Sequence, residues 1–486
     1  MINRRDLIKA SIGAASYAMV STIARPVSGH GFLNYFGQNN NRRPNIILCM
    51  ADDQGWGDMA YNGHPVLKTP NFDAMASEAL RFNRFYAAAP VCSPTRGSVL
   101  TGRHPNRFGC FTAGYSLRPQ EETIAETLKA AGYVTGHFGK WHLGSIFKNS
   151  PVNPGGYGFN EWVSAPNFFD NDPILSKNGS AIQFKGESSM VTVDAAIDFI
   201  RRHSQSDQPF LAVVWFGSPH RPLKAIEQDA ALYSDQPEQL QHYYGEITGM
   251  DRALGKLRNE LRTLNIHENT ILWYCSDNGG LKGTNRIRGH KSEIYDGGLR
   301  VPAILEWPKR IKTPRTTDIP CNTSDIYPTI MELIGAKPDK KLPLDGTSLA
   351  PLIDKKMKAR PKPMGFWHYP AEVIRISGNE DMSVLLDAQK SGKQIEDKWL
   401  CLDANKNRKF PDDEFPGHSA WLDWPWKLHR IETKGIVTLE LYNIAKDIGE
   451  NNDLSAQQPQ RVREMKSELE QWMKSVVHSL NGEDYQ

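Results

Sequence analysis

The chain has 486 residues, of which 39% are hydrophobic and 23% charged, and 58 basic against 55 acidic side chains give a formal net charge of +3. This length suggests one large domain with a smaller one, or two to three domains, rather than a single small core. The small and dispersed charge excess excludes the strongly basic surface of a nucleic-acid-binding protein, so no nucleic-acid partner is expected.

The first element in chain order is an N-terminal export signal. Arg4 and Arg5 form a twin-arginine pair, and the mildly apolar stretch 10–24 that follows is too short and too rich in small residues for a good membrane span. These features predict a Tat-type signal peptide over residues 1–24, with the Tat export machinery as a partner and a periplasmic or secreted location in a bacterium. A disordered tail or an uncleaved anchor is the alternative interpretation.

Beyond a polar stretch that ends near Arg43, strand-like and helix-like segments alternate. Apolar runs predict strands over 45–50, 133–138, 210–216, 270–275 and 301–305. Apolar residues at helical spacing predict helices over 71–80, 122–131, 194–202 and 240–264. This alternation predicts an α/β fold with a large, mostly parallel sheet flanked by helices on both faces.

The character of the sequence changes near residue 365. A tryptophan-rich stretch at 421–426 and the run 437–442 predict short strands of a smaller antiparallel sheet, and apolar residues at helical spacing predict a terminal helix over 460–477. We therefore expect a main domain over 44–365, which carries the chemistry described below, and a C-terminal subdomain over 366–486.

Six cysteines are too few for a dense disulfide framework in a chain of this length. Cys49 and Cys275 lie inside strand-like runs and are predicted to be small core residues. A disulfide among Cys110, Cys321 and Cys401 stays open, without an assignable pairing.

Polar side chains follow four of the predicted strands at the point where each strand ends. Asp52 and Asp53 follow the first, and the stretches 139–142, 217–220 and 276–280 follow the others. Ligands of open α/β sheets bind outside the carboxyl ends of the strands. We therefore expect these side chains to meet at one edge of the sheet.

Asp52, Asp53, Asp277 and Asn278 form an oxygen-only set of candidate metal ligands at that edge. Carboxylate and amide oxygens suit hard divalent cations such as Ca²⁺ or Mg²⁺, whereas Zn²⁺ more often recruits His or Cys. Asp52 and Asp53 alone are equally typical of a turn with a helix N-cap. The second acid–amide pair, after another strand, favours the metal site.

Five further residues would add cations and proton donors at the same edge: Arg96, Lys140, His142, His220 and Lys291. Lys and Arg bind the oxygens of anionic groups, and His is the usual acid for a poor leaving group. Taken singly, such residues are more often solvated charges or structural histidines. Their expected convergence near Cys92 is what indicates a site.

Three segments carry a family resemblance. The run 91–103, which contains Cys92, Pro94 and Arg96, has the C-x-P-x-R form of the sulfatase signature, and the runs 132–142 and 295–302 match further segments of that family. The chain resembles the formylglycine-dependent sulfatases of the alkaline phosphatase-like superfamily, most strongly over 44–310. Phe138 stands where a smaller residue is usual.

The resemblance implies a role for each candidate residue. In that family the signature cysteine is oxidised enzymatically to formylglycine (3-oxoalanine), whose hydrate is the nucleophile. Cys92 would be the precursor and, once modified, would face one Ca²⁺, or Mg²⁺, bound by the four oxygen ligands. Arg96 would hold the hydrate, Lys140 and Lys291 would grip the sulfate, His142 would orient and later deprotonate the hydrate, and His220 would protonate the leaving alcohol. The neighbouring His290 leaves a one-residue slip at Lys291 open.

These roles imply a sulfuric ester hydrolase for sulfated poly- or oligosaccharides, matured by a formylglycine-generating or sulfatase-maturating enzyme. The alternatives are a broad-specificity arylsulfatase and a phosphate or phosphonate ester hydrolase of the same superfamily; a non-catalytic glycan-binding protein is the rival from another class. Side chains that could frame a sugar, although such residues are more often structural or on the surface, are Tyr115, Asn167, Phe168, Phe169, Arg221, Arg286, His418 and Trp421.

Overall fold

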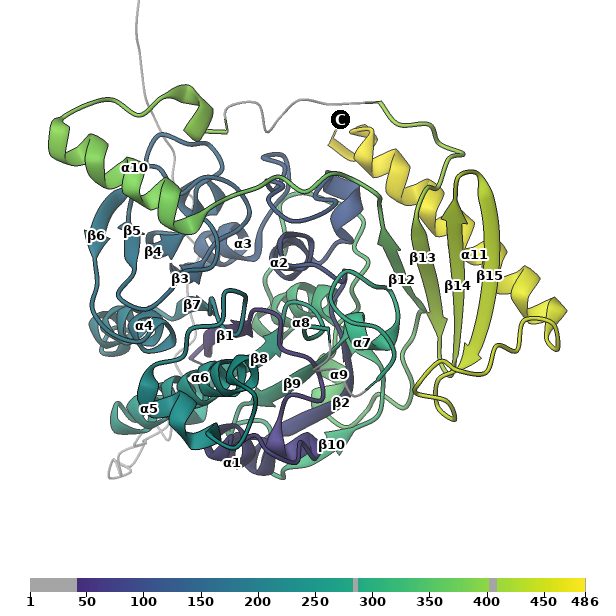
Figure 1. Cartoon of the computed structure of the whole chain (residues 1–486), viewed down its shortest axis with the longest axis horizontal. Helices are drawn as coiled ribbons and strands as arrows, with labels where there is room; N and C mark the ends of the chain where they lie inside the picture. The colour runs from purple at the N-terminus through teal and green to yellow at the C-terminus, as the bar shows by residue number, and fades with distance from the viewer. Residues whose placement is uncertain (1–41, 283–286, 402–408, 486) are drawn as a thin grey trace, which may run out of the picture. The chain divides into compact units, whose positions relative to one another are not determined.

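An eleven-stranded mixed sheet forms the centre of the computed structural model (Figure 1). The structure describes residues 42–282, 287–401 and 409–485; the predicted signal peptide and Arg286 lie outside these ranges. The strands of the large sheet are β1 Asn45–Ala51, β2 Leu80–Tyr86, β3 Val134–Lys140, β4 Glu161–Ala165, β5 Ile174–Lys177, β6 Ser180–Gln183, β7 Phe210–Trp215, β8 Thr270–Ser276, β9 Arg300–Glu306, β10 Arg315–Thr317 and β11 Cys321–Asn322.

The strand order explains how distant parts of the sequence meet. Neighbours follow the order β10-β2-β9-β8-β1-β7-β3-β4-β5-β6, and β11 pairs with β2. β1 runs parallel to both β7 and β8, and β3 runs parallel to both β7 and β4. The pairs β8–β9, β2–β9, β4–β5 and β5–β6 are antiparallel. The four strands predicted to lead into polar residues are therefore consecutive parallel neighbours, and their carboxyl ends share one edge.

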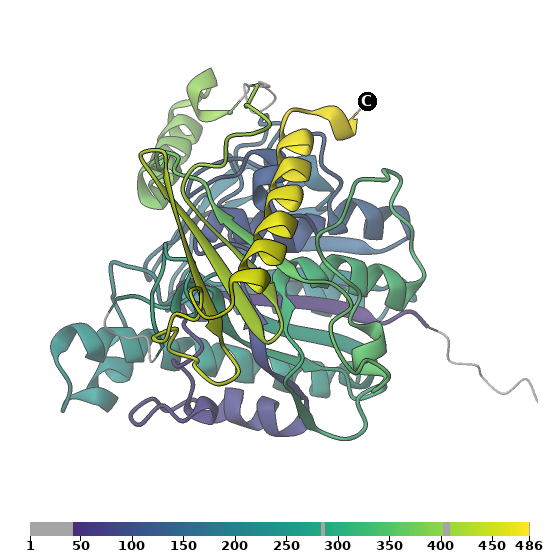
Figure 2. The same cartoon turned by 90° about the vertical axis from the view of Figure 1, so that its right-hand side faces the viewer.

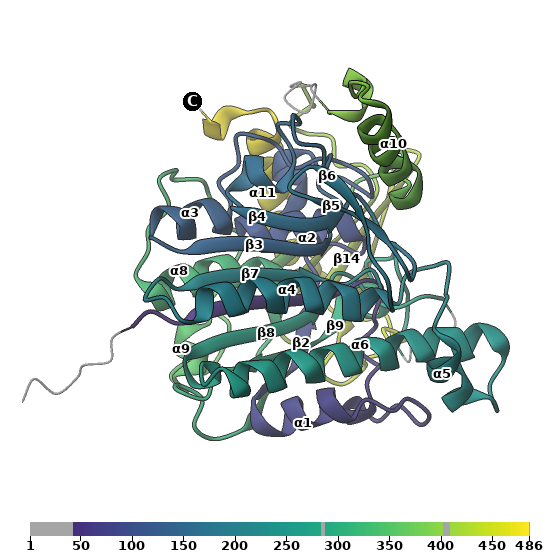
Figure 3. The ribbon, with the colours of Figure 1, turned by 90° about the vertical axis from the view of Figure 1, so that its left-hand side faces the viewer.

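Helices cover both faces of the large sheet, as predicted (Figure 3). On one face lie α1 Pro70–Glu78, α4 Ser188–Ser204 and α6 Glu238–Thr263, with α5 Glu227–Ala230 packed on α6. On the other face lie α2 Cys92–Thr101, α3 Ile124–Ala130, α8 Ile326–Ile334 and α9 Ala350–Ile353. Two further helices are α7 Asp296–Leu299, which leads into β9, and α10 Gly378–Ser391, which contacts β5 and β6.

β1 shows why these strands read as continuous apolar runs. Ile46, Leu48 and Met50 pack into the core on the α2 face, and the alternating residues Ile47 and Cys49 pack into the core on the α6 face. Successive side chains of a strand point to opposite faces, so a strand covered on both sides needs apolar residues throughout. Each fully buried aliphatic side chain contributes about 1.5–3 kcal/mol.

A four-stranded antiparallel sheet follows the large one, with the order β12-β13-β14-β15. Its strands are β12 Met364–His368, β13 His418–Asp423, β14 Trp426–Thr433 and β15 Ile436–Asn443, and α11 Pro459–Leu480 lies across them (Figure 2). The smaller sheet and terminal helix that the sequence predicts are thus confirmed. The described residues from Arg43 onward form one compact unit, and the boundary expected near residue 365 stays a prediction.

Several local expectations change. The helix predicted over 71–80 ends at Glu78, and Leu80 begins β2. The strand predicted over 301–305 is present as β9, but it runs antiparallel to β8. Each of the six cysteines is free, so the disulfide left open above does not form; Cys49 and Cys275 are buried core residues as predicted. Among the described residues, no helix has the length and apolar character needed to cross a bilayer.

Candidate active site

Two adjacent aspartates follow β1 at the sheet edge, and both are fully buried. Asp52 accepts a hydrogen bond from Lys140 Nζ at 2.6 Å, and the N–H of Asp53 donates to Asp277 Oδ1 at 3.1 Å. The backbone of Asp53 is left-handed, with φ of 68°. This conformation costs a non-glycine residue about 1–2 kcal/mol. Such strained residues concentrate where the surroundings hold a functional geometry.

Asp277 and Asn278 follow β8, the neighbour of β1. Asn278 Nδ2 donates to Asp53 Oδ1 at 2.9 Å, which links the ends of the two strands. Asp277 Oδ2 accepts hydrogen bonds from Nε and Nη2 of Arg96 at 3.0 and 2.6 Å. Burial and the nearby Asp52 carboxylate raise the pKa of Asp277. The second pair of predicted oxygen ligands therefore lies directly against the first.

Cys92 begins α2, and its side chain is only 1% exposed. Its Sγ lies within 4.8 Å of carboxylate oxygens of Asp52 and Asp277. Arg96 is one helical turn further on, on the same face of the helix, and also donates to the carbonyl oxygen of Lys140 at 3.1 Å. Burial raises the pKa of the Cys92 thiol, although two nearby lysines act against this. The unmodified thiol is therefore held in its protonated form.

Lys140 and His142 come from the end of β3. The side chains of Lys140 and Asp52 are both fully buried, and each charge is balanced by the other. His142 is 3% exposed and left-handed, with φ of 52°. Burial, followed by the positive charges of Lys140 and Arg96, lowers the pKa of His142 far below its usual range. Within the described chain its Nδ1 has no hydrogen-bond partner, so a neutral imidazole with an available ring nitrogen is present.

His220 lies after β7, between the site and solvent. Its Nε2 is 3.7 Å from Asp53 Oδ2, and its side chain is 17% exposed. Its Nδ1 lies 2.6 Å from the carbonyl oxygen of Arg221, which places the ring proton on Nδ1 because a carbonyl only accepts. Phe168 stacks on the ring with 4.4 Å between ring centroids. Burial lowers the pKa of His220 to about 3.

Lys291 reaches the site from the loop between β8 and β9. Its Nζ lies 2.7 Å from Asp53 Oδ2. Although burial alone would lower it, the pKa of Lys291 is raised by Asp53 and other negative groups. His290 turns elsewhere: its Nδ1 lies 2.8 Å from the carbonyl oxygen of Lys291 and its Nε2 3.6 Å from Glu293. Lys291, rather than its neighbour, is the residue of this loop that enters the cluster.

The charges of the site balance. Three carboxylates and three cations lie in direct contact with one another, and the histidines are neutral; the six are Asp52, Asp53, Asp277, Arg96, Lys140 and Lys291. A bound divalent cation would leave an excess of two positive charges. Because the surroundings are buried, that excess would attract an anionic group strongly.

Unpartnered oxygens indicate where a cation fits. Across the described ranges, Asp52 Oδ1 and Asn278 Oδ1 are buried and have no hydrogen-bond partner. Asp52, Cys92 and Asp277 can each offer one ligand atom within 4.8 Å of the others, and so can Asp52, Asp53 and His220. Buried polar atoms normally find a partner. This donor set, dominated by oxygen, fits a hard divalent cation.

The structure brings together every residue that the sequence analysis named as a metal or catalytic candidate. The side chains that the sequence suggested could frame a sugar fall into two groups, one near the site and one with structural contacts elsewhere. Phe168 lies on His220, and Asn167 donates to the carbonyl oxygen of Ile376 at 2.8 Å. His418 and Trp421 are structural instead, because they bond to His429 and Glu468 in and beside the small sheet. Phe169 packs in the core on the α6 face.

Sequence reasoning missed Trp215, the last residue of β7. Its indole ring lies 5.2 Å from the guanidinium carbon of Arg96, as a cation–π contact, and the residue is fully buried. The run 210–216 is apolar throughout, so the composition gave no reason to separate Trp215 from the core. Its position at the end of a site-bearing strand was the available signal.

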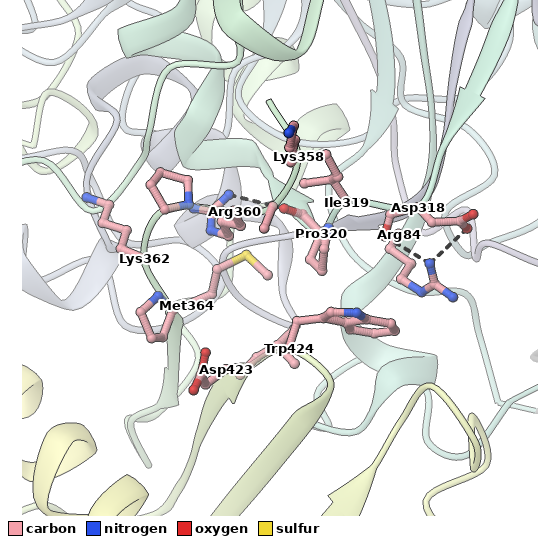
Figure 4. Close-up of a pocket in the computed structure, with 14 residues that line it drawn as sticks. Arg84, Asp318, Ile319, Pro320, Lys358, Arg360, Lys362, Met364, Asp423 and Trp424 are labelled. Carbon is pink, nitrogen blue, oxygen red and sulfur yellow. Dashed lines mark hydrogen bonds and ion pairs between the residues drawn. The ribbon is translucent and has the colours of Figure 1, made fainter. Parts of the chain in front are cut away.

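A separate cavity of about 330 Å³ lies between β2, the segment leading to β12 and the β13–β14 turn (Figure 4). Its two arginines are already paired: Arg84 lies 2.8 Å from Asp318 and over the ring of Trp424, and Arg360 lies 2.6 Å from Asp325. Lys362 extends away from the other lining residues (Figure 4). None of the candidate catalytic residues lines this cavity, so it is not the entrance to the site.

Residues 44–336 match the family model described as Sulfatase. The chain is 32% identical over 396 residues to N-acetylgalactosamine-6-sulfatase of Mus musculus, covering 72% of this chain and 71% of that protein. It is also 32% identical over 341 residues to the ulvan-active sulfatase of Formosa agariphila, covering 65% and 66%. The matched segment thus spans about two thirds of the length of such relatives.

Solved structures show the same fold. The crystal structure of Ps i-CgsB has a TM-score of 0.74 and 25% identity, covering 90% of this chain and 98% of that one. Its complex with k-i-k-neocarrahexaose gives the same TM-score at 24% identity. The family match covers more than half of the chain and contains the whole cluster described above. The chain therefore belongs to the sulfatase family.

Proposed function

We propose that this protein is a sulfatase that hydrolyses sulfate monoesters with a formylglycine at position 92. The observation that carries the proposal is the setting of Cys92. Burial raises the pKa of its thiol, which is the opposite of what a thiolate nucleophile needs. Around it lie buried oxygen ligands, three cations and two histidines, which are the groups that an oxygen nucleophile attacking an anionic ester requires.

The proposed metal is one Ca²⁺ per chain, with Mg²⁺ as the alternative. Asp52, Asp53, Asp277 and Asn278 would hold it together with the modified residue 92. Support comes from the buried oxygens of Asp52 and Asn278 that accept no hydrogen bond from the described residues. Ca²⁺ is favoured because three carboxylates and an amide oxygen would supply many protein ligands, whereas Mg²⁺ is usually bound through one or two carboxylates and keeps several waters. When bound, the cation would supply Lewis-acid stabilisation of negative charge.

The chain's own residues would then bind and orient the reacting groups. Lys140 and Lys291 would hold two sulfate oxygens, and each would exchange part of its present carboxylate contact for the ester. Arg96 holds Asp277 through two nitrogens, and so keeps that carboxylate beside residue 92. A formylglycine hydrate would supply one hydroxyl, which would pass its proton to Asp277 as it attacks sulfur and displaces the alcohol. Loss of a proton from the second hydroxyl would then re-form the aldehyde and break the bond to sulfate.

Two histidines would move the protons. His220, at the solvent side with Nε2 near Asp53, would take up a proton on Nε2 beside that carboxylate and give it to the departing alcohol. His142, neutral and with Nδ1 unpartnered among the described atoms, would accept the proton of the second hydroxyl. The roles are separate because the two rings come from different strand ends, β7 and β3.

Sulfated poly- or oligosaccharides are the proposed substrates. Relatives and neighbours support this class: one is named an ulvan-active sulfatase, and another was solved in complex with k-i-k-neocarrahexaose. A broad arylsulfatase and a phosphate or phosphonate ester hydrolase remain the rival functions. The spacing of Lys140 and His142 at the end of β3, and a cluster of oxygen ligands that among the described residues would hold one metal, favour the sulfate ester.

The decisive experiment combines mass spectrometry with substrate comparison. The peptide containing residue 92 should be about 18 Da lighter than its thiol form, since conversion replaces the thiol by an aldehyde. Cys92→Ala should abolish activity. The purified enzyme should hydrolyse defined sulfated oligosaccharides faster than the matching phosphate esters. An active preparation with an unmodified thiol, or a preference for phosphate esters, would contradict the proposal.

Maturation and export are proposed from the sequence. Modification of Cys92 requires a formylglycine-generating or sulfatase-maturating enzyme as a partner. The twin arginines at positions 4 and 5 support Tat-dependent export, and a periplasmic or secreted location. Replacing both arginines with lysine should trap the protein in the cytoplasm, as cell fractionation would show.

A further inference from the structure

A buried group of charged side chains ties the loop of Lys291 to the four-stranded sheet. This charged cluster consists of Asp296, Lys427, His429 and Glu450. Lys427 Nζ lies 2.8 Å from Asp296 Oδ1 and 3.0 Å from Glu450 Oε1, and His429 Nε2 lies 2.7 Å from the same Oε1. The four side chains are 0–1% exposed. None of them belongs to the catalytic site described above.

The charged cluster joins two parts of the fold. Lys427 and His429 stand two residues apart on β14, hence on the same face of the small sheet, while Asp296 begins α7 beside that sheet (Figure 1). The surroundings are apolar on both sides: Tyr86, Ile294 and Leu299 meet Met364, Phe366, Ala420, Leu422, Tyr442 and Ile444. The ions are therefore enclosed in an apolar interface.

An interface of this kind needs no ions for its stability. Replacing a buried ion pair by apolar side chains is often neutral or stabilising. This cluster is nevertheless closely satisfied, since Glu450 Oε2 accepts the N–H of Asp296 at 2.7 Å and the hydroxyl of Tyr86 donates to Asp296 Oδ2 at 3.2 Å. A fully connected polar network specifies one geometry. What it specifies here is the position of Asp296.

Asp296 stands at the base of a loop, 288–298, whose two ends are held together. The N–H of Gly297 donates to the carbonyl oxygen of Arg288 at 2.6 Å. A Cβ on Gly297 would lie 2.1 Å from the carbonyl oxygen of Gly289, and one on Gly298 would lie 2.0 Å from that of Glu293. The backbone at 297–298 is thus in contact with the backbone at 289 and 293. A shift of Asp296 would therefore displace the whole base of the loop.

The same loop presents Lys291 to the site. The N–H of Lys291 donates to the carbonyl oxygen of Gly280 at 3.0 Å, and that of Ser292 donates to Pro90, two residues before Cys92, at 2.8 Å. Lys291 Nζ then reaches Asp53. A displacement of Asp296 would be passed along this short loop to the ammonium group.

We propose that Lys427 is a positioning residue: through Asp296 and Glu450 it fixes the loop that presents Lys291 to the sulfate group. The small sheet is thereby part of the catalytic machinery rather than a separate lobe. The nature of the group that Lys291 holds rests on the proposed function, whereas the tie between β14 and the loop does not. Lys427 remains charged in its apolar setting, because Asp296 and Glu450 raise its pKa against the effect of burial.

The test compares two variants of the full chain, Lys427→Met and the control Arg258→Met. Arg258 lies 2.8 Å from Glu306, with side chains 6% and 9% exposed. This pair is at the opposite edge of the large sheet, since Glu306 pairs with Leu272 near the start of β8. Each variant removes a buried cation from a carboxylate, so each should lower the melting temperature.

Only Lys427→Met should loosen the loop. Measured well below both melting temperatures, deuterium uptake of the backbone over 288–298 should rise in this variant and not in Arg258→Met. Inhibition by inorganic sulfate should weaken about tenfold, equivalent to ~1.4 kcal/mol. Unchanged uptake over 288–298, or an equal rise in the control, would overturn the proposal.

A second variant covers the case in which Lys427→Met does not fold. Glu450→Gln keeps the shape of the side chain and removes one of the two negative charges that hold Lys427, and it should show the same two effects. If the unaltered protein neither cleaves sulfate esters nor binds sulfate, the proposed function fails. The deuterium uptake still decides the positioning role in that case.

Discussion

Two histidines lie beside the signature cysteine, and they differ in what surrounds them. His142 is enclosed, with cations nearby, and His220 borders solvent with Phe168 on one face of its ring. An acid is needed only when the leaving group is a poor one, because a stable phenolate departs without a proton. The dependence of the rate on the leaving group can therefore identify the acid.

His220→Asn should lower kcat on a sulfated sugar by about 10²–10⁴-fold, the usual contribution of a general acid. The same variant should lose far less on 4-nitrophenyl sulfate. Steady-state kinetics on both substrates measures the difference. His267→Asn, a change at a half-buried histidine between α6 and β8, is the control and should leave both rates unchanged. Equal losses on the two substrates would show that His220 is not the acid.

At the scale of the element, the end of β3 depends on one glycine. Gly139 has φ of +97°, and a Cβ there would lie 1.9 Å from the carbonyl oxygen of Trp215 on β7. The next residue is Lys140, so the close approach of β3 and β7 fixes the position of the backbone from which the Lys140 side chain extends. A side chain at 139 would separate the strands at the site.

Gly139→Ala should therefore lower both the melting temperature and kcat. Gly132→Ala is a matched control, because Gly132 has φ of +89° but no atom within 4 Å of an added Cβ. The control should cost only the backbone term of about 1–2 kcal/mol and keep kcat. Thermal melts and initial rates distinguish the two; similar behaviour of both variants would contradict this account.

The helices and strands differ in how well the sequence predicts them. Strands β1, β7 and β8 are predictable to within about a residue because burial on both faces leaves long apolar runs. α2 is not, since Ser93 and Gly97 have low helix propensity and Pro94 is tolerated only because it lies in the first turn. Strand-end logic finds the aspartates and Lys140, whereas Lys291 lies in a loop and is found only through the family resemblance. The cluster of Lys427 and Asp296 has no local mark, because its partners are far apart in the sequence.

At the scale of the whole molecule, binding of a metal at the site should raise the free energy of unfolding. Anything that binds only the folded chain stabilises it, by about 2.7 kcal/mol at a concentration 100 times its Kd. Ca²⁺ should therefore raise the melting temperature of chelator-treated protein, and Mg²⁺ should raise it less. Asp53→Asn should reduce the shift, while Asp318→Asn, at an exposed carboxylate outside the site, should not. A melting temperature unaffected by both cations would contradict the metal site.

The two sheets should also depend on each other. A chain ending at Pro363 lacks β12–β15 and α11, and it would expose Tyr86, Ile294 and Leu299, which now pack against the small sheet. Exposed apolar surface of this kind favours aggregation. We expect such a chain to be insoluble, as its yield in the soluble fraction would show. A soluble, cooperatively melting fragment would instead support an independently folding domain over 44–365.

The strand order determines how late during synthesis the edge of the sheet around Cys92 can form. β1 lies between β7 and β8 in the sheet, so the edge that buries Cys92 is incomplete until β8 has been synthesised. About 185 residues separate Cys92 from Asp277, which at ~5–20 residues per second amounts to about 10–40 s of synthesis. Once folded, the cysteine is 1% exposed and out of reach of another enzyme. If Cys92 is modified as proposed, the topology would give the maturation enzyme a limited interval in which to act, and a chain that folded early would keep its thiol.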